Sequence, residues 1–418
     1  LPEDMVAEAL TEWSRIVKDG GRFILHLPKA HDKAKWEVSR ETIVASVASI
    51  GRGFDLAFFM EREDDYICAF KLVSGSGQAF SCDAPKPAKT CAIVRLGAIG
   101  DAIQCGTIFP WLHEQGYSIT LYTSETGYEV LMHDPHVSRF IIQGKDEIPP
   151  QVLGEFWDYE KKKYDKWVNL SESVECTLLA APGHTNHGWP DSVRAKYLDV
   201  NYLEFTHELA EVPPPYRPKF YSTIEERAWA KDKARSYGKR NILWSLSGSS
   251  VHKTWPHLDA VVAAIMLHMP DVHIVMVGDE LSQILEAGWE KERRVHRQSG
   301  KWSIRESMAF AEVADLIIGS ETGLLNAAGS METPKIVTLS HSSEKMLTKW
   351  WKNTIALKQP AGVGCAKFPC RQMHMDWTFC PSYEDEHTKA ALCQYHIGPD
   401  EMMRAIVSVL GQPQRKVA

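Results

Sequence analysis

The stretch from Thr90 to Leu112 constrains the fold of this chain more than any other part of it. An apolar run from Cys91 to Val94 predicts a buried strand, and apolar residues at helical spacing from Ile103 onward predict a helix. Gly97 and Gly100 stand between them, where they let the backbone turn sharply and bring the helix N-terminus close to a bound ligand. Strand, glycine turn and helix form the opening unit of a doubly wound α/β domain, although the spacing is not the G-x-G-x-x-G dinucleotide fingerprint.

Asp101 follows this turn directly, where the predicted helix begins. Two interpretations of its carboxylate remain open on this stretch alone. It is either an N-terminal acid that satisfies unpaired backbone N–H groups and the helix dipole, or a group that takes part in chemistry at the turn. The first arrangement is the commoner one in proteins.

Alternating strands and helices continue along the chain and predict two doubly wound domains. The first, residues 90–215, has further strands near residues 118–123, 137–142 and 167–170, and the second, residues 216–360, has strands near 241–247, 272–277, 315–319 and 335–339. Such alternation implies parallel sheets that are covered on both faces. The run Pro213–Pro215 marks a hinge, and ligands of this architecture bind in the crevice between the strand ends.

Two segments of the second domain have the composition of phosphate-binding loops. Ser249, Ser250 and Lys253 follow its first strand and offer backbone N–H, hydroxyl and ammonium donors that suit a diphosphate. An ordinary strand–helix loop is an equally good interpretation of that segment on chemistry alone. A second glycine turn, residues 320–329, opens a helix of small residues, and Glu280 after the second strand can accept hydrogen bonds from ribose hydroxyls.

In this order the motifs resemble those of glycosyltransferase family nine, the ADP-heptose:lipopolysaccharide heptosyltransferases and their relatives. The matching segments are RLGAIGD at residues 95–101, GSS and KTWP within 248–256, VGDE at 277–280 and GSETGLLNAA at 319–328. Each motif is common alone, whereas four in this order over residues 90–410 are more specific. The resemblance implies the GT-B fold, which has two facing Rossmann-like α/β domains. It also implies metal-independent, inverting transfer of a sugar from a nucleotide-diphosphate-sugar donor to an acceptor hydroxyl.

The resemblance further implies roles for particular residues. Asp101 becomes the general base that deprotonates the acceptor hydroxyl, since an inverting displacement needs one carboxylate opposite the leaving diphosphate. Hydroxyls, Lys253 and helix N-termini then stabilise the developing charge without Mg²⁺. The residues expected to bind the nucleotide-sugar donor are Gly97, Gly100, Ser249, Ser250, Lys253, Glu280, Glu321, Thr322, Gly323, Leu324 and Asn326.

Two positions depart from the family pattern. Glu321 stands where the family usually has Asp, and Asn326 stands where it usually has His. Both positions touch the donor in relatives, so the donor is not fixed as ADP-heptose, although an ADP-sugar remains the first expectation. The alternative from another class is a catalytically silent nucleotide-sugar-binding or scaffold module, in which these two residues record lost activity.

Residues 1–75 resemble the C-terminal part of a class I methyltransferase. The segment Trp13–Arg22 matches the helix end and the lysine-x-glycine-glycine turn of that family. A strand is expected at 22–27 and a helix at about 40–50, and paired strands near 54–60 and 66–72 match the family's last strands. The glycine-rich loop that binds S-adenosylmethionine there would lie before Leu1, so this segment alone is not expected to methylate. A small α/β appendage of other ancestry is the remaining interpretation. Residues 76–89, rich in Gly, Ser, Pro and Lys, predict a linker.

Composition narrows the partners and the location. The net charge of −7 gives no global attraction to nucleic acid or to an anionic membrane. No apolar run is long enough for a transmembrane helix, and nine cysteines, an odd number, do not suggest a secreted disulfide framework. We expect a cytoplasmic protein, either free or peripheral at a membrane surface. Its oligomeric state stays open.

The acceptor is expected to be a glycan of the lipopolysaccharide type, or another hydroxyl in a polysaccharide, a protein or a modified nucleobase. A nucleic-acid acceptor is not indicated by the charge of the chain. The polar loop His184–Pro190, with two histidines and a tryptophan, and the basic run Lys161–Lys163 are the segments where we expect acceptor contacts. Histidines in such a loop are more often simply solvated.

Residues 361–418 form a cysteine-rich segment followed by a terminal helix. Its four cysteines have the spacing C-x4-C-x9-C-x12-C, which lacks the paired C-x2-C knuckles of a strong zinc motif. Three interpretations stay open, namely free structural thiols, a structural zinc or other metal site, and disulfides. The residues concerned are Cys365, Cys370, Cys380 and Cys393. No metal is expected in catalysis, and no cofactor is expected beyond the donor substrate.

Overall fold

The structure, a computed structural model, describes residues 89–411 except 145–146, 150, 375–379 and 384–388, together with three strands nearer the N-terminus. These strands are β1 (Arg22–Pro28), β2 (Phe54–Glu61) and β3 (Asp65–Leu72), which pair antiparallel in the order β1-β3-β2. They confirm the three strands predicted in residues 1–75, whereas the helices predicted there lie outside the described residues. The linker predicted at 76–89 also lies outside them, except for Lys89. In the described part of the chain, no helix is long and apolar enough to cross a membrane.

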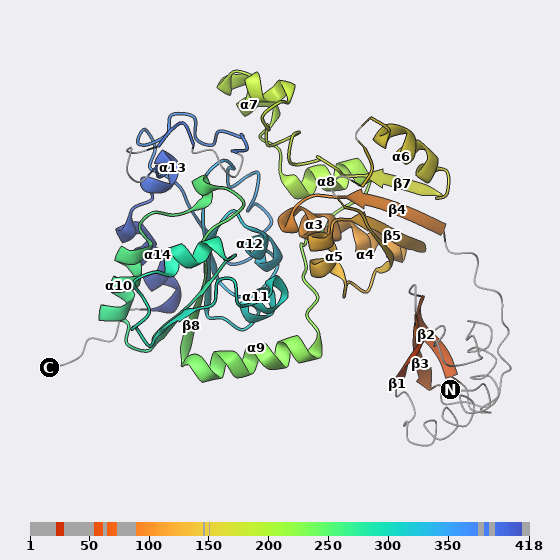
Figure 1. Ribbon diagram of the computed structural model, residues 1–418, viewed down its shortest axis with the longest axis horizontal. Helices are drawn as coiled ribbons and strands as arrows, with labels where there is room; N and C mark the ends of the chain where they lie inside the picture. The colour runs from red at the N-terminus through yellow and green to blue at the C-terminus, as the bar shows by residue number, and fades with distance from the viewer. Residues whose placement is uncertain are drawn as a thin grey trace.

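The first α/β domain is built on a four-stranded parallel sheet in the order β6-β5-β4-β7 (Figure 1). The strands are β4 (Lys89–Arg95), β5 (Tyr117–Thr123), β6 (Val137–Ile142) and β7 (Lys166–Asn169), so all four predicted strands are confirmed. The helical segments are α3 (Ile99–Cys105), η1 (Gly106–Ile108), α4 (Phe109–Glu114), α5 (Glu125–Leu131), α6 (Leu153–Lys161), η2 (Thr185–Gly188), α7 (Asp191–Tyr197) and α8 (Tyr202–Ala210).

Alternation along β4 explains why this sheet is covered on both faces. Cys91 and Ile93 share a buried cluster with Ile103 of α3, whereas Ala92 and Val94 pack on the opposite face with Trp157 of α6. Successive side chains of a strand point to opposite faces, so a strand that is apolar at every position needs a helix on each side.

The second domain has a six-stranded parallel sheet in the order β10-β9-β8-β11-β12-β13. Its strands are β8 (Arg240–Ser245), β9 (Val272–Val277), β10 (Val295–Arg297), β11 (Leu316–Ser320), β12 (Lys335–Thr338) and β13 (Thr354–Leu357). The four strands that the sequence predicts are confirmed, and the two short outer strands β10 and β13 are additions. The helical segments are α9 (Ile224–Tyr237), η3 (Val251–Lys253), α10 (Leu258–His268), η4 (Leu281–Glu286), α11 (Ile304–Ala311), α12 (Gly323–Ala328), α13 (Leu392–Tyr395) and α14 (Pro399–Leu410).

The terminal helix α14 is part of the core of the second domain. Met402 and Ile406 are fully buried in one cluster with Val262 and Ile265 of α10. At its end, the carbonyl of Leu410 accepts a hydrogen bond from Arg240 at 2.6 Å. The last helix of the described residues therefore covers one face of this sheet.

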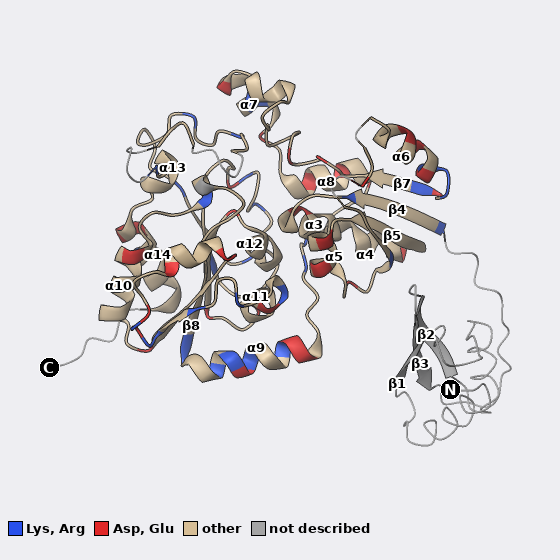
Figure 2. Cartoon of the chain, viewed as in Figure 1, with Lys and Arg blue, Asp and Glu red and all other residues tan. Residues whose placement is uncertain are grey.

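The two domains contact each other directly, and α3 and α12 form the centre of that contact (Figure 1). Ile103 of α3 and Leu324 of α12 belong to the same buried apolar cluster. At the start of α8, the Asn201 side chain donates to the carbonyl of Lys345 at 2.9 Å. After the proline hinge, α9 carries acidic and basic residues along its length (Figure 2). The carboxyl ends of β4 and β11, from which α3 and α12 follow, are thereby brought together.

Candidate active site

The carboxyl end of β4 carries a charge cluster of Arg95, Asp101 and Glu175. Arg95 closes the strand and is only 2% exposed. Its guanidinium donates to the two Glu175 oxygens at 2.6 and 2.5 Å, and its Nη2 lies 2.9 Å from Oδ1 of Asp101. The other Asp101 oxygen accepts from the backbone N–H of Ala98 at 3.0 Å. Asp101 therefore does cap α3, as the first interpretation holds, and its side chain keeps 19% of its surface exposed.

In this cluster two carboxylates share one arginine. Burial raises the pKa of Glu175, and the Asp101 charge adds to that effect, while Arg95 opposes it. Burial disfavours the charge on Arg95, but Asp101 and Glu175 outweigh burial and raise its pKa. The arginine is thus permanently charged, and Glu175 holds a proton more strongly than an exposed glutamate does.

Gly97 is the point on which both carboxylates converge. A Cβ added there would lie 2.9 Å from Oδ2 of Asp101 and 2.9 Å from Oε1 of Glu175. Real Cβ atoms do not come so close to other atoms, so a side chain at this position would push the acids apart. This close approach explains the first glycine of the turn.

Gly100 and Gly323 let the first turns of α3 and α12 touch. A Cβ on Gly323 would lie 2.5 Å from Cγ2 of Ile99, and a Cβ on Gly100 would lie 3.0 Å from Nδ2 of Asn326. A buried hydrogen bond from Gln104 Nε2 to Asn326 Oδ1, at 2.8 Å, fastens the two helices. The helix that carries Asp101 is therefore seated on the helix that follows the second glycine turn.

The predicted donor residues of α12 lie at this contact, and most of them are buried against protein. Thr322 is the N-cap, with its Oγ1 3.3 Å from Oγ of Ser245, and its carbonyl accepts from Nδ2 of Asn326 at 2.9 Å. Leu324 is 3% exposed and Asn326 is 6% exposed. The structure thus places these residues beside the Asp101 cluster, with their side chains engaged by the protein.

The loop after β8 brings the predicted phosphate-binding residues to the same place. Ser249 is exposed, and its Oγ accepts from Nζ of Lys253 at 3.3 Å. The lysine lies across Gly248, where a Cβ would meet Cδ of Lys253 at 2.6 Å and Cγ2 of Thr322 at 3.4 Å. The hydroxyl-rich loop and the N-terminus of α12 are therefore neighbours, as a diphosphate site requires.

A buried hydrogen-bond chain runs inward from this loop. Ser250 Oγ lies 2.8 Å from Nδ1 of His252, and His252 Nε2 lies 2.9 Å from Nδ1 of His341. His341 Nε2 in turn lies 2.7 Å from Oε2 of Glu321. All four residues are buried, and they come from three loops at the carboxyl ends of β8, β11 and β12.

Glu321 ends this chain as an ionised group. Its Oε1 accepts from the backbone N–H of Ser340 at 2.6 Å and from that of Ser342 at 3.2 Å. Burial opposes its charge, but His341 and these hydrogen bonds outweigh burial and lower the pKa of Glu321. Burial, together with the positive charges nearby, lowers the pKa of His252 well below its ordinary value. The carboxylate is thus held by protein groups, and its predicted role as a donor contact stays a prediction.

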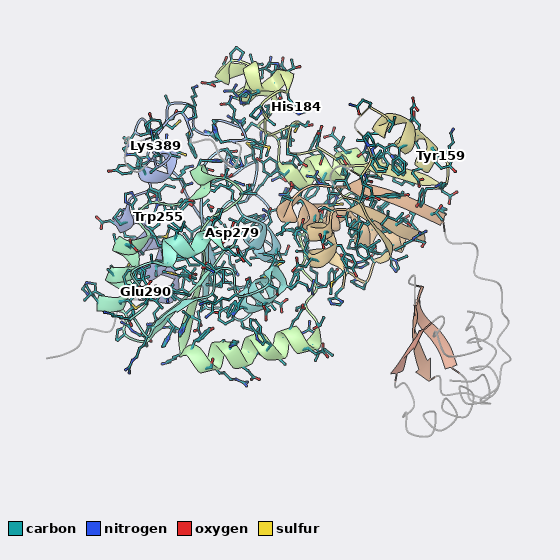
Figure 3. All side chains as sticks on the ribbon, viewed as in Figure 1. Tyr159, His184, Trp255, Asp279, Glu290 and Lys389 are labelled. Atoms are coloured by element: carbon teal, nitrogen blue, oxygen red, sulfur yellow. The ribbon has the colours of Figure 1, made fainter. Side chains whose placement is uncertain are left out.

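Glu280 lies at the start of η4 and is exposed. Its neighbour Asp279, labelled in Figure 3, is hydrogen-bonded within the turn. Its Oδ1 accepts from the backbone N–H and from the hydroxyl of Ser282, at 2.9 and 2.8 Å. The Ser282 hydroxyl is bonded to that of Ser247 at 2.7 Å, which ties this turn to the loop after β8. Of the two acids after β9, Glu280 is therefore the one left for a ribose.

The acceptor side was expected at the loop His184–Pro190 and at Lys161–Lys163. The loop forms η2, and its Asn186 donates to the carbonyls of Cys176 and Thr177 at 2.7 and 3.0 Å. Lys163 pairs with Glu160 of α6 at 2.6 Å, on the side of the molecule where Figure 3 labels Tyr159. Because α6 packs on the sheet face opposite α3, the basic run is on the other side of the sheet from that helix. Acceptor contacts at both segments stay a prediction.

One metal-capable group occurs in this region. Among the described residues, ligand atoms of Glu172, Cys176 and His184 lie within 4.8 Å of one another. Glu172 and His184 are exposed, and Cys176 is half-buried (His184 is labelled in Figure 3). Burial and the neighbouring acids raise the pKa of the Cys176 thiol to about 11, so without a cation it stays protonated.

The four cysteines of the C-terminal segment line one pocket together with His252, His341 and His374. The structure leaves all four as free thiols, and within the described residues no three of their sulfur atoms lie within 4.8 Å of one another. Burial raises the pKa of Cys370 to about 12. The fold thus gathers the predicted cluster without disulfides, and its metal site stays a prediction.

Several residues of these networks were not predicted. Arg95 and His252 lie inside the quoted motifs, where a charged residue closing an apolar strand and a histidine among hydroxyl residues were the available signals. Glu175 and His341 join them from 80 and 89 residues away, and nothing in the local sequence marks them.

Comparisons with known proteins identify the family and the fold. The model of the family described as Glycosyltransferase family 9 (heptosyltransferase) matches residues 160–373, more than half of the chain. A lipopolysaccharide heptosyltransferase 1 from Campylobacter coli is 22% identical over 281 residues, which is 59% of this chain and 82% of that protein.

Two solved structures share the fold. E. coli ADP-heptose lps heptosyltransferase II superposes with a TM-score of 0.53 at 15% identity, over 77% of this chain and 98% of that one. A glycosyl transferase family 9 protein from Veillonella parvula superposes with a TM-score of 0.55 at 14% identity, over 77% and 97%. These likenesses confirm the predicted architecture of two parallel-sheet α/β domains of GT-B type. Neither the family match nor the curated relative gives support to the methyltransferase resemblance of residues 1–75.

Proposed function

Because this chain belongs to glycosyltransferase family 9, the heptosyltransferase family, and is a glycosyltransferase, we propose that it moves a sugar from a nucleotide-diphosphate donor to an acceptor hydroxyl with inversion. Asp101 is the general base, and catalysis needs no metal ion. The alternative, a catalytically silent binding or scaffold module, is disfavoured because the matching family consists of glycosyltransferases. The family model begins at residue 160, so the role of Asp101 is supported by geometry and motif order alone.

One observation carries the proposal. The helix whose first turn carries Asp101 packs directly on the helix that begins at Gly323, through the glycine contact and the hydrogen bond between Gln104 and Asn326. The general base lies at the carboxyl edge of the first sheet, and the anion-binding groups lie at the carboxyl edge of the second sheet. The helix contact holds these two edges close together. An inverting transfer requires this arrangement, since the base and the leaving diphosphate lie on opposite sides of the sugar carbon.

On the acceptor side, Asp101 takes the proton of the attacking hydroxyl while Arg95 and Ala98 N–H hold the carboxylate in position. A carboxylate held within reach of the hydroxyl contributes to rate as a general base. Glu175 binds both Nη1 and Nη2 of the same guanidinium, and Asp101 shares Nη2 with it, so Arg95 does not neutralise Asp101 alone. We assign Glu175 to positioning.

On the donor side, the Ser249 and Ser250 loop and Lys253 neutralise the diphosphate as the C–O bond breaks and negative charge moves to the leaving oxygen. Glu280 binds the ribose, and the backbone at Thr322, Gly323 and Leu324 approaches the nucleotide-sugar. Relatives are named for ADP-heptose and lipopolysaccharide, which makes an ADP-sugar and a glycan hydroxyl the first substrates to test. The departures at Glu321 and Asn326 leave the donor sugar open.

A thermal-shift screen of the protein against ADP-, UDP-, GDP- and CDP-sugars, with and without Mg²⁺, tests this function. A ligand that binds only the folded state raises the melting temperature by mass action. We expect one nucleotide to raise it, equally without Mg²⁺. A shift that requires Mg²⁺ would contradict the metal-independent mechanism, and no shift with any donor would contradict a preformed donor site.

Structural zinc in the pocket of Cys365, Cys370, Cys380 and Cys393 is a separate proposal, supported by the gathering of four thiols at one pocket. Native mass spectrometry should detect one bound metal ion, which serine substitutions at Cys365 and Cys393 remove. A metal-free mass of the native protein would refute it.

A further inference from the structure

Three side chains of different chemistry converge on the loops between β7 and α7. The carboxylate of Glu172, the thiol of Cys176 and the imidazole of His184 each offer one ligand atom, and these atoms all lie within 4.8 Å of one another. His184 is labelled in Figure 3 and stands directly before η2. The proposed transfer mechanism uses none of the three, and the described lining of the pocket of four cysteines includes none of them. The group is therefore a separate feature of the fold.

The backbone holds two of these residues in an unusual conformation. Glu172 and Cys176 have φ angles of 59° and 66°, in the left-handed region that residues other than glycine rarely adopt. The Thr177 hydroxyl donates to the carbonyl of Glu172 at 2.7 Å, and Nδ2 of Asn186 donates to the carbonyl of Cys176 at 2.7 Å. Backbone of this kind persists where the surrounding contacts determine it, and it is common at binding sites. The loop thus presents both side chains to His184 from a fixed backbone.

Asn186 fastens the two loops of the group together. It belongs to η2, and its buried side chain donates to the carbonyl of Thr177 at 3.0 Å as well as to that of Cys176. His184 is the N-cap of the same helical turn, and its imidazole makes no capping hydrogen bond. The histidine is therefore fixed through its backbone, while its ring stays available to a ligand.

Two buried oxygen atoms on the same segments give an independent observation. Oγ of Ser171, next to Glu172, and Oδ1 of Asn186, two residues from His184, have no hydrogen-bond partner among the described residues. Buried polar atoms in proteins nearly always have a partner, so such atoms mark positions where a water molecule or an ion completes the contacts. Their place beside two of the three residues points to a bound species at these loops.

Oxygen, sulfur and nitrogen ligands together suit a divalent cation of the zinc class. Zn²⁺ binds carboxylate, thiolate and imidazole, and three protein ligands with one water molecule is a common arrangement. Mg²⁺ and Ca²⁺ require oxygen ligands throughout, whereas this group offers a single carboxylate. Ligand atoms around tetrahedral zinc lie about 3.3–3.6 Å apart, so the side chains must close by up to about 1.5 Å. Glu172 and His184 are exposed, which leaves room for that movement.

We propose that Glu172, Cys176 and His184 bind one divalent cation of the zinc class, with water at its remaining position. The cation joins the loop after β7 to the start of η2 and stabilises this junction. On binding, the Cys176 thiol gives its proton to solvent, because the thiolate is the ligand.

This cation takes no part in the proposed transfer. Glu175, the neighbour of Cys176, is already held by Arg95 through contacts at 2.6 and 2.5 Å, which do not depend on the cation. The reaction should therefore run at the same kcat when the cation is removed, in keeping with a mechanism that needs no metal ion.

Native mass spectrometry of the full chain, before and after addition of ZnCl₂, tests the site. We expect one zinc ion beyond those present before the addition, together with a higher melting temperature by mass action. Cys176→Ser and His184→Gln should each weaken this binding by about 100-fold or more, because loss of an outer-shell partner alone costs about 10–100-fold. No additional ion in the wild-type protein, or an additional ion that binds both variants equally well, overturns the inference.

His187→Gln is the matched control for the histidine. His187 lies in the same helical turn but outside the group of three, so this variant should bind the additional ion as the wild-type protein does. Serine substitutions at Cys365 and Cys393 separate the two proposed metal sites and should also leave the additional ion in place. Loss of that ion in either control overturns the inference. Donor binding and transfer are measured separately, so failure here leaves the proposed function standing.

Discussion

Arg95 shows how one buried residue can set the chemistry of a site. Its guanidinium is shared between Asp101 and Glu175, with contacts of 2.9 Å to the first and 2.6 and 2.5 Å to the second. The guanidinium fixes the position of the Asp101 carboxylate, and Glu175 shares the charge of the same guanidinium. Capping of α3 and base catalysis are therefore compatible roles for Asp101.

Glu175→Gln should lower kcat by about tenfold or more, less than loss of the base itself. Arg95 then loses its charged contacts with Glu175, so it holds Asp101 less firmly in position. Steady-state rates at saturating substrate measure this effect. Glu172→Gln, three residues away and exposed, is the control and should leave kcat unchanged. A kcat equal to that of the wild-type protein in Glu175→Gln would remove Glu175 from the mechanism.

At the scale of elements, α3 and α12 decide whether the two halves of the site meet. The predicted strands were all found because each is a short apolar run between turn residues. Such a run is typical of a strand that is buried on both faces of a sheet. The outer strands β10 and β13 have three and four residues, too short for any periodicity to mark them. The contact between α3 and α12 was not predictable from the sequence. Gly100 and Gly323 are more than 200 residues apart, and each alone is explained as a turn residue.

Gly323→Ala should separate these helices. Its Cβ would lie 2.5 Å from Cγ2 of Ile99 and 3.2 Å from the backbone nitrogen of Gly100, so α12 must shift, at about 1–3 kcal/mol. Thermal unfolding and transfer assays should show a lower melting temperature and a larger loss of turnover. Gly154→Ala in α6 is the control, since nothing lies within 4 Å of its Cβ, and it should be neutral or stabilising by about 0.5–1 kcal/mol. Equal behaviour of the two variants would mean that the close approach is not needed.

At the scale of the whole molecule, the order of motifs predicted the family and the two-domain architecture, because each motif sits where a buried strand ends. The site was predicted only in part. Local chemistry marked Asp101, Ser250 and Lys253 as candidates, but helix capping and an ordinary strand–helix loop explained them as well, and the family resemblance supplied their expected roles. Glu175 and His341 acquire their roles only when the fold brings them to Arg95 and His252, so no local pattern could identify them.

Asp101→Asn tests the central claim most directly. Asparagine keeps an oxygen for the Ala98 N–H, so α3 retains its cap while the base is lost. Turnover and donor affinity should be measured on the same preparation. The account predicts a fall in kcat of about 10²–10⁴-fold with donor affinity close to that of the wild-type protein. Turnover equal to that of the wild-type protein would contradict the assignment of Asp101 as the base.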